Sequence, residues 1–249
     1  MNGTTVLGCR VDAAGVDEAV RRIVELARGS EPASVVTLGT EMVVRARRDA
    51  RFRAVLNASA LSLCDTVGVM YVARAQGLRL PGRVTGIDLL DPLCAALARE
   101  GLGIYLLGAK GDTAARAGAA LAGRHPGLRI CGARDGYFGP ADDASVAAAI
   151  GASGAAVLLV GLGSPRQELW IADHLVQAGA KVGIGVGGSF DVLAGNVERA
   201  PEVWRRLNVE WLYRLVREPW RWRRQLALPA FVWFAICERL GASRRGSTA

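Results

Sequence analysis

The sequence predicts an α/β fold in which helices cover both faces of a mostly parallel sheet, with a helical appendage at the C-terminus. Short apolar runs alternate with amphipathic stretches of helical length, which is the pattern of parallel strands joined by helical crossovers. The chain has 249 residues, 51% hydrophobic and 22% charged, enough for one substantial domain and a smaller unit. After about Arg199, glycine and alanine give way to tryptophan and arginine. We therefore expect a core domain over residues 1–198 and an appendage over 199–249.

The individual elements follow from these patterns. The N-terminal segment Thr4–Val11 is expected to add a strand or a hairpin. Apolar runs predict the sheet strands Ser34–Leu38, Ala60–Cys64, Gly103–Leu107, Leu128–Cys131, Ala156–Val160 and Lys181–Val186. Helical patterns predict Val16–Arg28, Glu41–Leu56, Val67–Ala75, Ile87–Arg99, Thr113–Arg124, Ser145–Gly151 and Pro165–Ala178. In the appendage, helices are expected to start or kink at Pro201, Pro219 and Pro229.

The charge balance points to an anionic partner. A formal net charge of +8 and an isoelectric point near 9.8 favour a nucleic acid, an acidic lipid or a phosphorylated ligand. The five cysteines are widely spread, without a C-x-x-C pair or a cysteine–histidine cluster, so neither a zinc site nor a disulfide framework is expected. A reducing cytoplasm fits best, and the N-terminus lacks the basic start and apolar core of a signal peptide.

The C-terminal part combines tryptophan and arginine with the longest apolar stretch, Leu226–Cys237. As a helix this stretch would be about 18 Å long, against about 30 Å of hydrocarbon core, so it is not expected to span a bilayer. Together with residues 204–224 it resembles an interfacial amphipathic helix, and we expect contact with an anionic membrane surface. A helix packed on the domain and a nucleic-acid contact are the alternatives.

Glycine-rich loops follow several strands at the edge where an open parallel sheet binds ligands. After the strand ending at Leu107, Gly108 permits close backbone approach and Lys110 offers a positive charge for a phosphate. After the next strand, Gly136 offers a backbone contact and Tyr137 an aromatic surface for a base or sugar. An ordinary turn, with a buried aromatic in the second case, is the alternative for each loop.

A third loop contains Gly163, followed by Ser164, which suits a helix N-cap, and Pro165, which suits the first helical position. That geometry would direct Arg166 or Gln167 toward a ligand at the helix N-terminus. A well-capped helix without a ligand gives the same pattern.

The fourth loop is the glycine-dense segment from Gly183 to Asp191, with Gly187, Gly188 and Phe190 in it. Positions 183, 185 and 188 formally match G-x-G-x-x-G. The match is discounted as a dinucleotide fingerprint because the glycines begin inside the strand and no acidic residue follows at the tip of a next strand. A nicotinamide-dependent oxidoreductase is an alternative that rests on glycine loops alone.

Asp65 directly follows an apolar run, at the carboxyl end of a predicted strand. A carboxylate there is placed to deprotonate a hydroxyl that attacks an anomeric carbon, whereas a helix N-cap is the simpler role. Thr37 and Asp88 lie near other strand ends, and Arg83 in a polar loop either contacts a sugar or diphosphate or is solvated. No D-x-D motif occurs, so arginines and helix N-termini, rather than a metal, would stabilise the charge of a leaving group.

Long motifs follow one another along the chain: T-L-x-x-E-M-V from Thr37, D-x-x-G-V from Asp65, R-V-x-G-I-D-L from Arg83, D-G-Y-F from Asp135, V-G-L-G-S-P-x-Q-E from Val160, G-G-S-F-D-V-L-A-G from Gly187, R-A-P from Arg199 and E-W-L-Y-R-L from Glu210. In this order they resemble the WecG/TagA/CpsF family of bacterial glycosyltransferases over nearly the full chain. Runs of this length are highly specific.

The resemblance implies a Rossmann-like, inverting transferase that needs no metal or other cofactor and builds cell-surface polysaccharide. It would move a hexose, an N-acetylhexosamine or a uronic acid from a UDP-sugar to a polyprenyl-diphosphate-linked glycan. It would work in the cytoplasm, peripheral on the inner face of the plasma membrane, against the anionic inner-membrane surface and without nucleic acid. The oligomeric state stays open, a homo-oligomer included. A basic membrane- or nucleic-acid-binding module without catalysis is the other alternative.

The resemblance also implies roles by motif position. Asp65 would be the general base, and Thr37, Arg83 and Gln167 would contact donor or acceptor. The loop from Gly187 to Asp191 would hold the nucleotide. With the glycine loops described above, the expected nucleotide-sugar contacts are Gly108, Lys110, Gly136, Tyr137, Gly163, Gly187, Gly188, Phe190 and Asp191. The appendage would close over the site, with contacts to the lipid diphosphate or to leaving UDP from Arg214, Arg221 and Arg224.

The sequence departs from the family pattern at one place. The family commonly has T-x-N-P-E, and here Gly39 and Thr40 replace the Asn-Pro pair. Because an amide side chain near the sugars is missing, specificity for N-acetylmannosamine is not carried over. A neutral hexose or a uronic acid is the expected donor sugar.

Overall fold

The core of the protein is a six-stranded sheet in which every neighbouring pair of strands is parallel. The computed structural model describes residues 2–206, 209–217, 222 and 226–246. The strands are β3 (Ala33–Leu38), β4 (Leu61–Cys64), β5 (Ile104–Gly108), β6 (Ile130–Arg134), β7 (Val157–Gly161) and β8 (Val182–Gly185). Their order across the sheet is β4-β3-β8-β7-β5-β6. The predicted α/β fold is confirmed.

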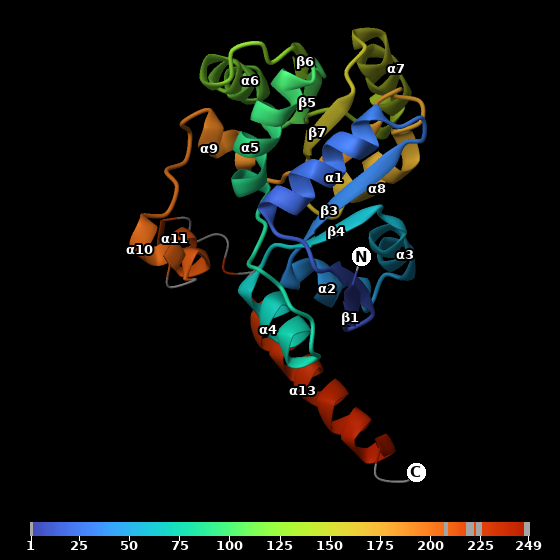
Figure 1. The fold of residues 1–249 in the computed structure, drawn as a ribbon, viewed down its shortest axis with the longest axis vertical. Coiled ribbons are helices and arrows are strands. Elements are labelled where there is room, and N and C mark those ends of the chain that lie inside the picture. Colours follow the sequence, from blue (N-terminus) through green and yellow to red (C-terminus); the bar gives the residue numbers. More distant parts are fainter. Residues whose placement is uncertain (1, 207–208, 218–221, 223–225, 247–249) are drawn as a thin grey trace.

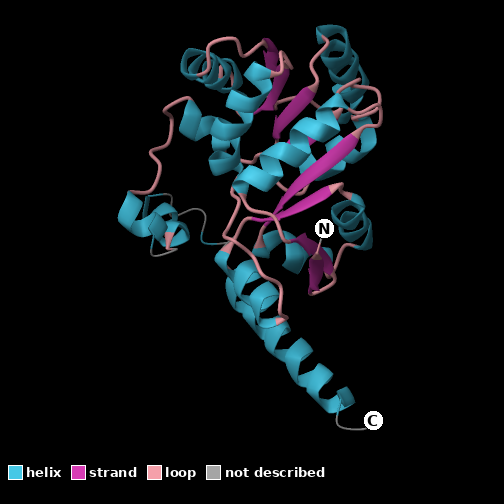
Figure 2. Ribbon diagram, in the orientation of Figure 1, coloured by secondary structure: helices cyan, strands magenta, loops and turns pink. Residues whose placement is uncertain are grey.

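Helices cover both faces of the sheet (Figures 1 and 2). Strand β7 shows how the residues alternate between the two faces. Its Val157 and Leu159 belong to the core cluster that α1, α5 and α6 complete, whereas Leu158 and Val160 pack with α7 and α8. The helices of the first face are α1 (Val16–Arg28), α5 (Gly86–Arg99) and α6 (Thr113–Arg124), and those of the second are α2 (Thr40–Ala46), α3 (Ala50–Ala58), α7 (Asp143–Ser153) and α8 (Arg166–His174).

The N-terminal segment forms the hairpin that was one of its two predicted states. Strands β1 (Gly3–Val6) and β2 (Cys9–Asp12) pair antiparallel. The hairpin is tied to the edge of the main sheet, because the Ser62 amide donates to Asp12 Oδ2 at 2.8 Å and the Ser62 hydroxyl donates to the Arg10 carbonyl at 2.6 Å. It therefore covers β4 at the sheet edge.

Two predicted helices are wrong in extent: Pro165–Ala178 ends four residues early, at His174, and Glu41–Leu56 is divided. The stretch Glu41–Leu56 forms two helices, α2 and α3, and not one. Asp49 caps α3, since its side chain accepts a hydrogen bond from the Phe52 amide at 2.9 Å. Short elements that the patterns did not indicate are the 3-10 turn η1 (Pro140–Asp142) and helix α9 (Ser189–Leu193), and α4 (Val67–Ala75) forms as predicted.

The appendage contributes three described helices, α10 (Glu202–Arg206), α11 (Glu210–Arg217) and α13 (Ala227–Gly246). Helices α10 and α11 lie beside the core after an extended segment, and α13 runs past α4 and projects from the body (Figure 1). Phe231 anchors α13: it is 2% exposed and packs in the cluster formed by α2, α3 and α4. Helix α10 starts directly after Pro201, Pro229 lies in the first turn of α13, and Pro219 lies outside the described residues.

None of the described helices combines the length and the apolar character that crossing a membrane requires. Along α13, Val232, Trp233 and Ile236 are exposed although they are apolar. Phe234 is instead partly buried and lies under the guanidinium of Arg47, 4.4 Å from the ring centre. Helix α13 therefore has one face bound to the core and one apolar face turned to solvent.

Candidate functional site

A cavity of about 610 Å³ lies at the carboxyl edge of the sheet, over the ends of β3, β4 and β8. Its position follows from the chain path. After β3 the chain enters α2 on one face of the sheet, whereas after the neighbouring strand β8 it enters α9, whose buried side chains join the core of the opposite face. Loops that diverge in this way open a crevice between two strands, which is where open α/β sheets bind ligands.

The cavity brings together the four residues of the predicted catalytic set. Thr37 comes from β3, Asp65 from the end of β4, Arg83 from the loop before α5, and Gln167 from the first turn of α8. Gly163, Gly187 and Gly188 of the predicted nucleotide-binding set also line it.

Asp65 extends the sheet by one residue, because its amide donates to the Leu38 carbonyl at 3.1 Å. The N-cap of α4 is Thr66, whose hydroxyl accepts from the Thr40 amide at 3.1 Å. The N-cap position considered for Asp65 is therefore occupied by its neighbour, whose side chain makes no capping hydrogen bond. The carboxylate lies in the cavity wall.

Arg83 contacts the backbone of Asp65. Its Nη1 donates to the Asp65 carbonyl at 3.4 Å, and the adjacent Val84 amide donates to the Cys64 carbonyl at 2.7 Å. The loop is thus fixed to the end of β4, and it places a permanent positive charge at the cavity wall.

Thr37 and Gln167 are fixed by hydrogen bonds at the end of β8. The Thr37 hydroxyl donates to the Gly185 carbonyl at 3.2 Å, which leaves its lone pairs free to accept. The Gln167 side chain is 4% exposed, and its Oε1 accepts from the Gly187 amide at 3.1 Å. Arg166, the other side chain considered at this helix start, is directed away: it donates to the carbonyls of Gly136 at 2.9 Å and Phe138 at 2.7 Å.

The remaining predicted nucleotide contacts lie outside this cavity wall. The loops after β5 and β6 are joined to each other and to β7, since the Gly136 amide donates to the Ala109 carbonyl at 2.8 Å and the Ala109 amide donates to the Gly161 carbonyl at 3.0 Å. A Cβ at Gly108 would lie 2.4 Å from the Gly161 carbonyl carbon, so glycine is needed there for close packing.

The side chains around these loops are placed accordingly. Lys110 is exposed and Tyr137 is 76% exposed, away from the wall. Phe190 is fully buried in the sheet core, and Asp191 accepts from Asn196 Nδ2 at 3.3 Å. Of the predicted appendage contacts, Arg214 lies on α11, and Arg221 and Arg224 lie outside the described residues.

Four appendage residues in the wall were not predicted by the sequence reasoning. Glu210 and Trp211 on α11 and Leu228 and Val232 on α13 line the cavity. A signal existed for the first two, which open the motif E-W-L-Y-R-L. Leu228 and Val232 carry no local signal, since long-range packing of α13 brings them there.

Burial shifts several titratable groups near the site. Burial raises the pKa of Glu168, against hydrogen bonds from Gln167 and Ser164 that lower it. Burial raises the pKa of Cys64 to about 12, with a further contribution from the Asp65 charge. Within the part of the chain that the structure describes, no three His, Cys, Asp or Glu side chains come together as a metal site would need.

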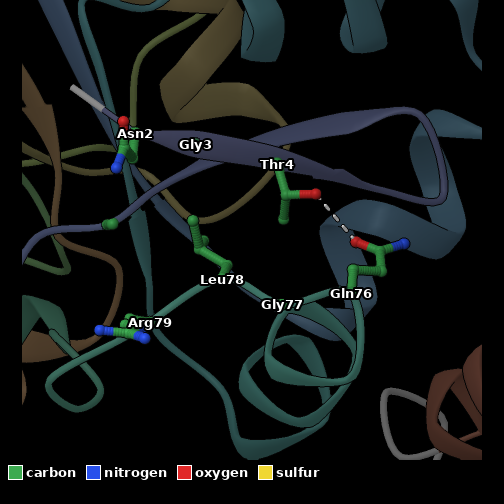
Figure 3. Close-up of a pocket in the computed structure, with 8 residues that line it drawn as sticks. Asn2, Gly3, Thr4, Gln76, Gly77, Leu78 and Arg79 are labelled. Atoms are coloured by element: carbon green, nitrogen blue, oxygen red, sulfur yellow. Dashed lines mark hydrogen bonds between the residues drawn. The ribbon is translucent and has the colours of Figure 1, made fainter.

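A second, smaller hollow of about 340 Å³ lies between β1 and the turn after α4 (Figure 3). The Thr4 hydroxyl donates to Gln76 Oε1 across it at 3.1 Å. Arg79 is the one charged residue among the described residues that line it, and none of the predicted site residues lies there. The larger cavity is therefore the candidate active site.

The chain is similar to known proteins over most of its length. Residues 4–245 match the family described as Glycosyl transferase WecG/TagA/CpsF family. Over 199 residues the chain is 36% identical to the N-acetylglucosaminyldiphosphoundecaprenol N-acetyl-beta-D-mannosaminyltransferase of Bacillus subtilis (strain 168). The aligned region covers 80% of this chain and 77% of that relative. The matched span includes every residue placed in the cavity wall.

Proposed function

Because the chain belongs to the WecG/TagA/CpsF family of glycosyltransferases, we propose that it moves a sugar from a UDP-sugar to an acceptor carried on polyprenyl diphosphate, with inversion and without a metal. The observation that carries the proposal is the meeting of Asp65, Arg83, Thr37 and Gln167 in one cavity. The acceptor class is taken from the printed name of the Bacillus subtilis relative.

Asp65 acts as the general base in this proposal. The acceptor hydroxyl gives its proton to the carboxylate while its oxygen bonds to the anomeric carbon, and the bond from that carbon to the UDP oxygen breaks. Attack from the face opposite UDP inverts the anomeric configuration. Thr37, whose hydroxyl proton is committed to the Gly185 carbonyl, accepts a hydrogen bond from a sugar hydroxyl.

Arginines stabilise the charge that develops on UDP. Among the described residues of the cavity wall, Arg83 is the one cation, and the acids are Glu41, Asp65 and Glu210. A diphosphate needs more positive charge than one guanidinium supplies. We therefore assign the additional contacts to the appendage arginines Arg214, Arg221 and Arg224.

Position 39 bears on the donor sugar. A Cβ at Gly39 would lie 3.9 Å from Asp65 Oδ2, so this position borders the proposed base. A side chain there would reach the reacting groups, and its absence supports a donor without the requirement for N-acetylmannosamine. The proposed donors are UDP-linked hexoses, N-acetylhexosamines and uronic acids.

The lipid end of the acceptor leaves along α13. Leu228 and Val232 line the cavity, and Trp233 and Ile236 continue the apolar surface outward at 64% and 48% exposure. We assign this surface to the anionic inner-membrane face, with the protein peripheral on the cytoplasmic side. Replacing Trp233 and Ile236 with Ser leaves Phe231 in place and should lower binding to anionic vesicles at least about tenfold. Val176→Ser, at a 77% exposed apolar residue elsewhere, is the control and should leave vesicle binding unchanged.

A panel of UDP-sugars with N-acetylglucosaminyldiphosphoundecaprenol as acceptor tests the function. The proposal expects transfer from at least one donor, undiminished by EDTA, and a product of opposite anomeric configuration. Parallel titrations with UDP and NADH are included. Binding of NADH without binding of UDP would replace the proposal with the oxidoreductase alternative.

A further inference from the structure

Glu168 is a carboxyl group buried directly beneath the cavity wall, and the proposed mechanism does not use it. The residue is 4% exposed, and its Oε2 has no partner at hydrogen-bond geometry among the described residues, although the Ser164 side chain lies near enough to lower the pKa of the carboxyl. A buried oxygen without a partner destabilises a fold, and an apolar side chain of the same size would avoid this cost. The position therefore keeps a carboxyl group at the expense of stability.

The start of α8 explains why this carboxyl points inward. Glu168 is the third residue of the helix, where a glutamate ordinarily accepts a hydrogen bond from the N-cap amide. Here the N-cap is Pro165, which has no amide hydrogen. The Glu168 Oε1 instead accepts a hydrogen bond from Gln167 Nε2 at 2.7 Å.

This bond fixes the orientation of the Gln167 amide. Gln167 Oε1 accepts from the Gly187 amide at 3.1 Å, so the nitrogen end must face Glu168, and one amide orientation satisfies both contacts. Gly187 has φ of 53° and lines the cavity. A chain of hydrogen bonds thus runs from the buried Glu168 through Gln167 to the glycine loop in the wall.

The end of β8 is built around the same pair. A Cβ at Gly185 would lie 2.6 Å from Gln167 Nε2 and 3.1 Å from Glu168 Oε1, so only glycine leaves room for them. The carbonyl of Gly185 also accepts the hydroxyl of Thr37. Two cavity-wall side chains, Thr37 and Gln167, are therefore positioned against the same strand residue, Gly185. Glu168 packs against that residue too.

We propose that Glu168 is a positioning residue for sugar transfer: it holds the Gln167 amide, and through it the Gly187 loop, in the geometry that the reactants need. The inference rests on the proposed function for the reaction it serves, and on the hydrogen bonds above for its action. Glu168 does not touch the reactants, since it is absent from the cavity wall. Its effect is transmitted through Gln167.

Two substitutions separate positioning from a purely structural role. Glu168→Gln retains an oxygen that accepts from Gln167 Nε2, whereas Glu168→Met keeps a similar unbranched shape and removes the acceptor. Ile171→Val, a buried change one turn further along α8, is the control for small packing defects. Each variant is measured in the full-length protein for kcat, KM, melting temperature and hydrogen exchange of the Gly187 amide.

The proposal expects Glu168→Met to lower kcat up to about 100-fold with a smaller change in KM, since a displacement of the order of 1 Å in a positioned group has this effect. The Gly187 amide should exchange about tenfold faster in Glu168→Met, because its acceptor is no longer held. The melting temperature should change little, because the substitution removes the unpartnered Oε2 but also takes the acceptor from Gln167 Nε2. Glu168→Gln should restore most of the turnover and the slow exchange, and Ile171→Val should keep wild-type turnover.

Three results would overturn the inference. Wild-type turnover and Gly187 exchange in Glu168→Met would show that no positioning occurs. A fall in melting temperature that accounts for the lost activity would assign Glu168 a structural role. Glu168→Gln as inactive as Glu168→Met would show that the charge, not the acceptor, matters. Failure of the wild type to bind UDP or transfer any sugar counts against the proposed function separately, since Gly187 exchange reports on Glu168 without any substrate.

Discussion

The two ends of the sheet finish in glycine-rich loops at the same edge, but they use those glycines differently. At the β5 and β6 end, the loops after the strands hydrogen-bond to each other and to β7, and Gly108 packs against the Gly161 backbone. At the β3, β4 and β8 end, the chain diverges to opposite faces, and the glycines line a cavity of about 610 Å³. Glycine at a strand end thus permits close approach, and the chain path decides whether a loop or a ligand approaches.

The largest expected effect comes from two aspartates in equivalent positions at these two ends. Asp65 follows β4 and lines the cavity, whereas Asp135 follows β6 and accepts from the Tyr137 amide at 2.8 Å. Asp65→Asn should lower kcat by about two to four orders of magnitude, as loss of a general base does, with unchanged affinity for UDP. Asp135→Asn should leave kcat unchanged. Steady-state kinetics and calorimetric UDP titration compare the two variants. An equal loss of kcat in both would show that the cavity end of the sheet is not catalytically different from the end with the joined loops.

Replacing a glycine with alanine should have different effects on stability and kcat at the two ends of the sheet. Gly108 has φ of 135° and no room for a Cβ, so Gly108→Ala should destabilise the fold by about 2 kcal/mol or more, with normal kcat in the protein that remains folded. Gly185→Ala would displace Gln167 and should lower kcat about tenfold or more in addition to stability. Denaturant unfolding and kinetics on the folded fraction measure both. A normal kcat in Gly185→Ala would show that the wall geometry at β8 is not critical.

Local sequence patterns predicted the elements of the fold, because each depends on its own residues. Helices such as Val16–Arg28 and Thr113–Arg124 have the predicted bounds, and the sheet strands overlap the predicted apolar runs, with β6 shifted from Leu128–Cys131 to Ile130–Arg134. The break at Asp49 was missed because the helical pattern continues on both sides of its N-cap. Asp65 and Gln167 were identified because strand ends and helix starts are local features.

The site could be predicted only in part, since its walls depend on strand order and long-range packing. Gly108 and Gly187 both follow strands, and no local feature indicates that one lies in a closed loop and the other in a cavity wall. Val232 reaches the wall because Phe231, next to it, is buried between helices of the core. Such contacts are fixed by the fold and not by a motif.

A smaller effect is expected where the appendage begins. Arg199 forms an ion pair with Asp88, which also accepts from the Thr85 hydroxyl at 2.6 Å. Burial raises the pKa of Asp88, but the Thr85 and Arg199 hydrogen bonds and the arginine charge outweigh it, so the net pKa lies below the ordinary value of 3.8. The pair then stabilises the fold above that pH, and its contribution is lost as pH falls through the lowered pKa.

Arg199→Met should therefore cost at most about 1 kcal/mol near neutral pH, because both side chains are partly exposed. The difference from wild type should shrink in acid. Urea unfolding at a series of pH values measures it, and a difference that stays constant down to low pH would show that packing, not the ion pair, is responsible.

An effect of similar size to that of Arg199→Met concerns the pH dependence of Glu168. Burial is the largest cause that raises its pKa above the ordinary 4.5, and the nearby charge of Glu41 adds to it. A raised pKa favours the neutral acid in the fold, so the wild type should lose stability relative to Glu168→Gln as pH rises from 4.5 through the folded pKa. The gap should be on the order of 1 kcal/mol. Melting curves from pH 4 to 8 test this, and a gap that narrows with rising pH would contradict the direction.

A structure of the protein with UDP bound tests most directly which end of the sheet holds the donor. We predict the diphosphate in the cavity between β3 and β8, beside Arg83 and within reach of Asp65. Density for UDP over the joined loops at Gly108 and Lys110, with the larger cavity empty, would contradict it.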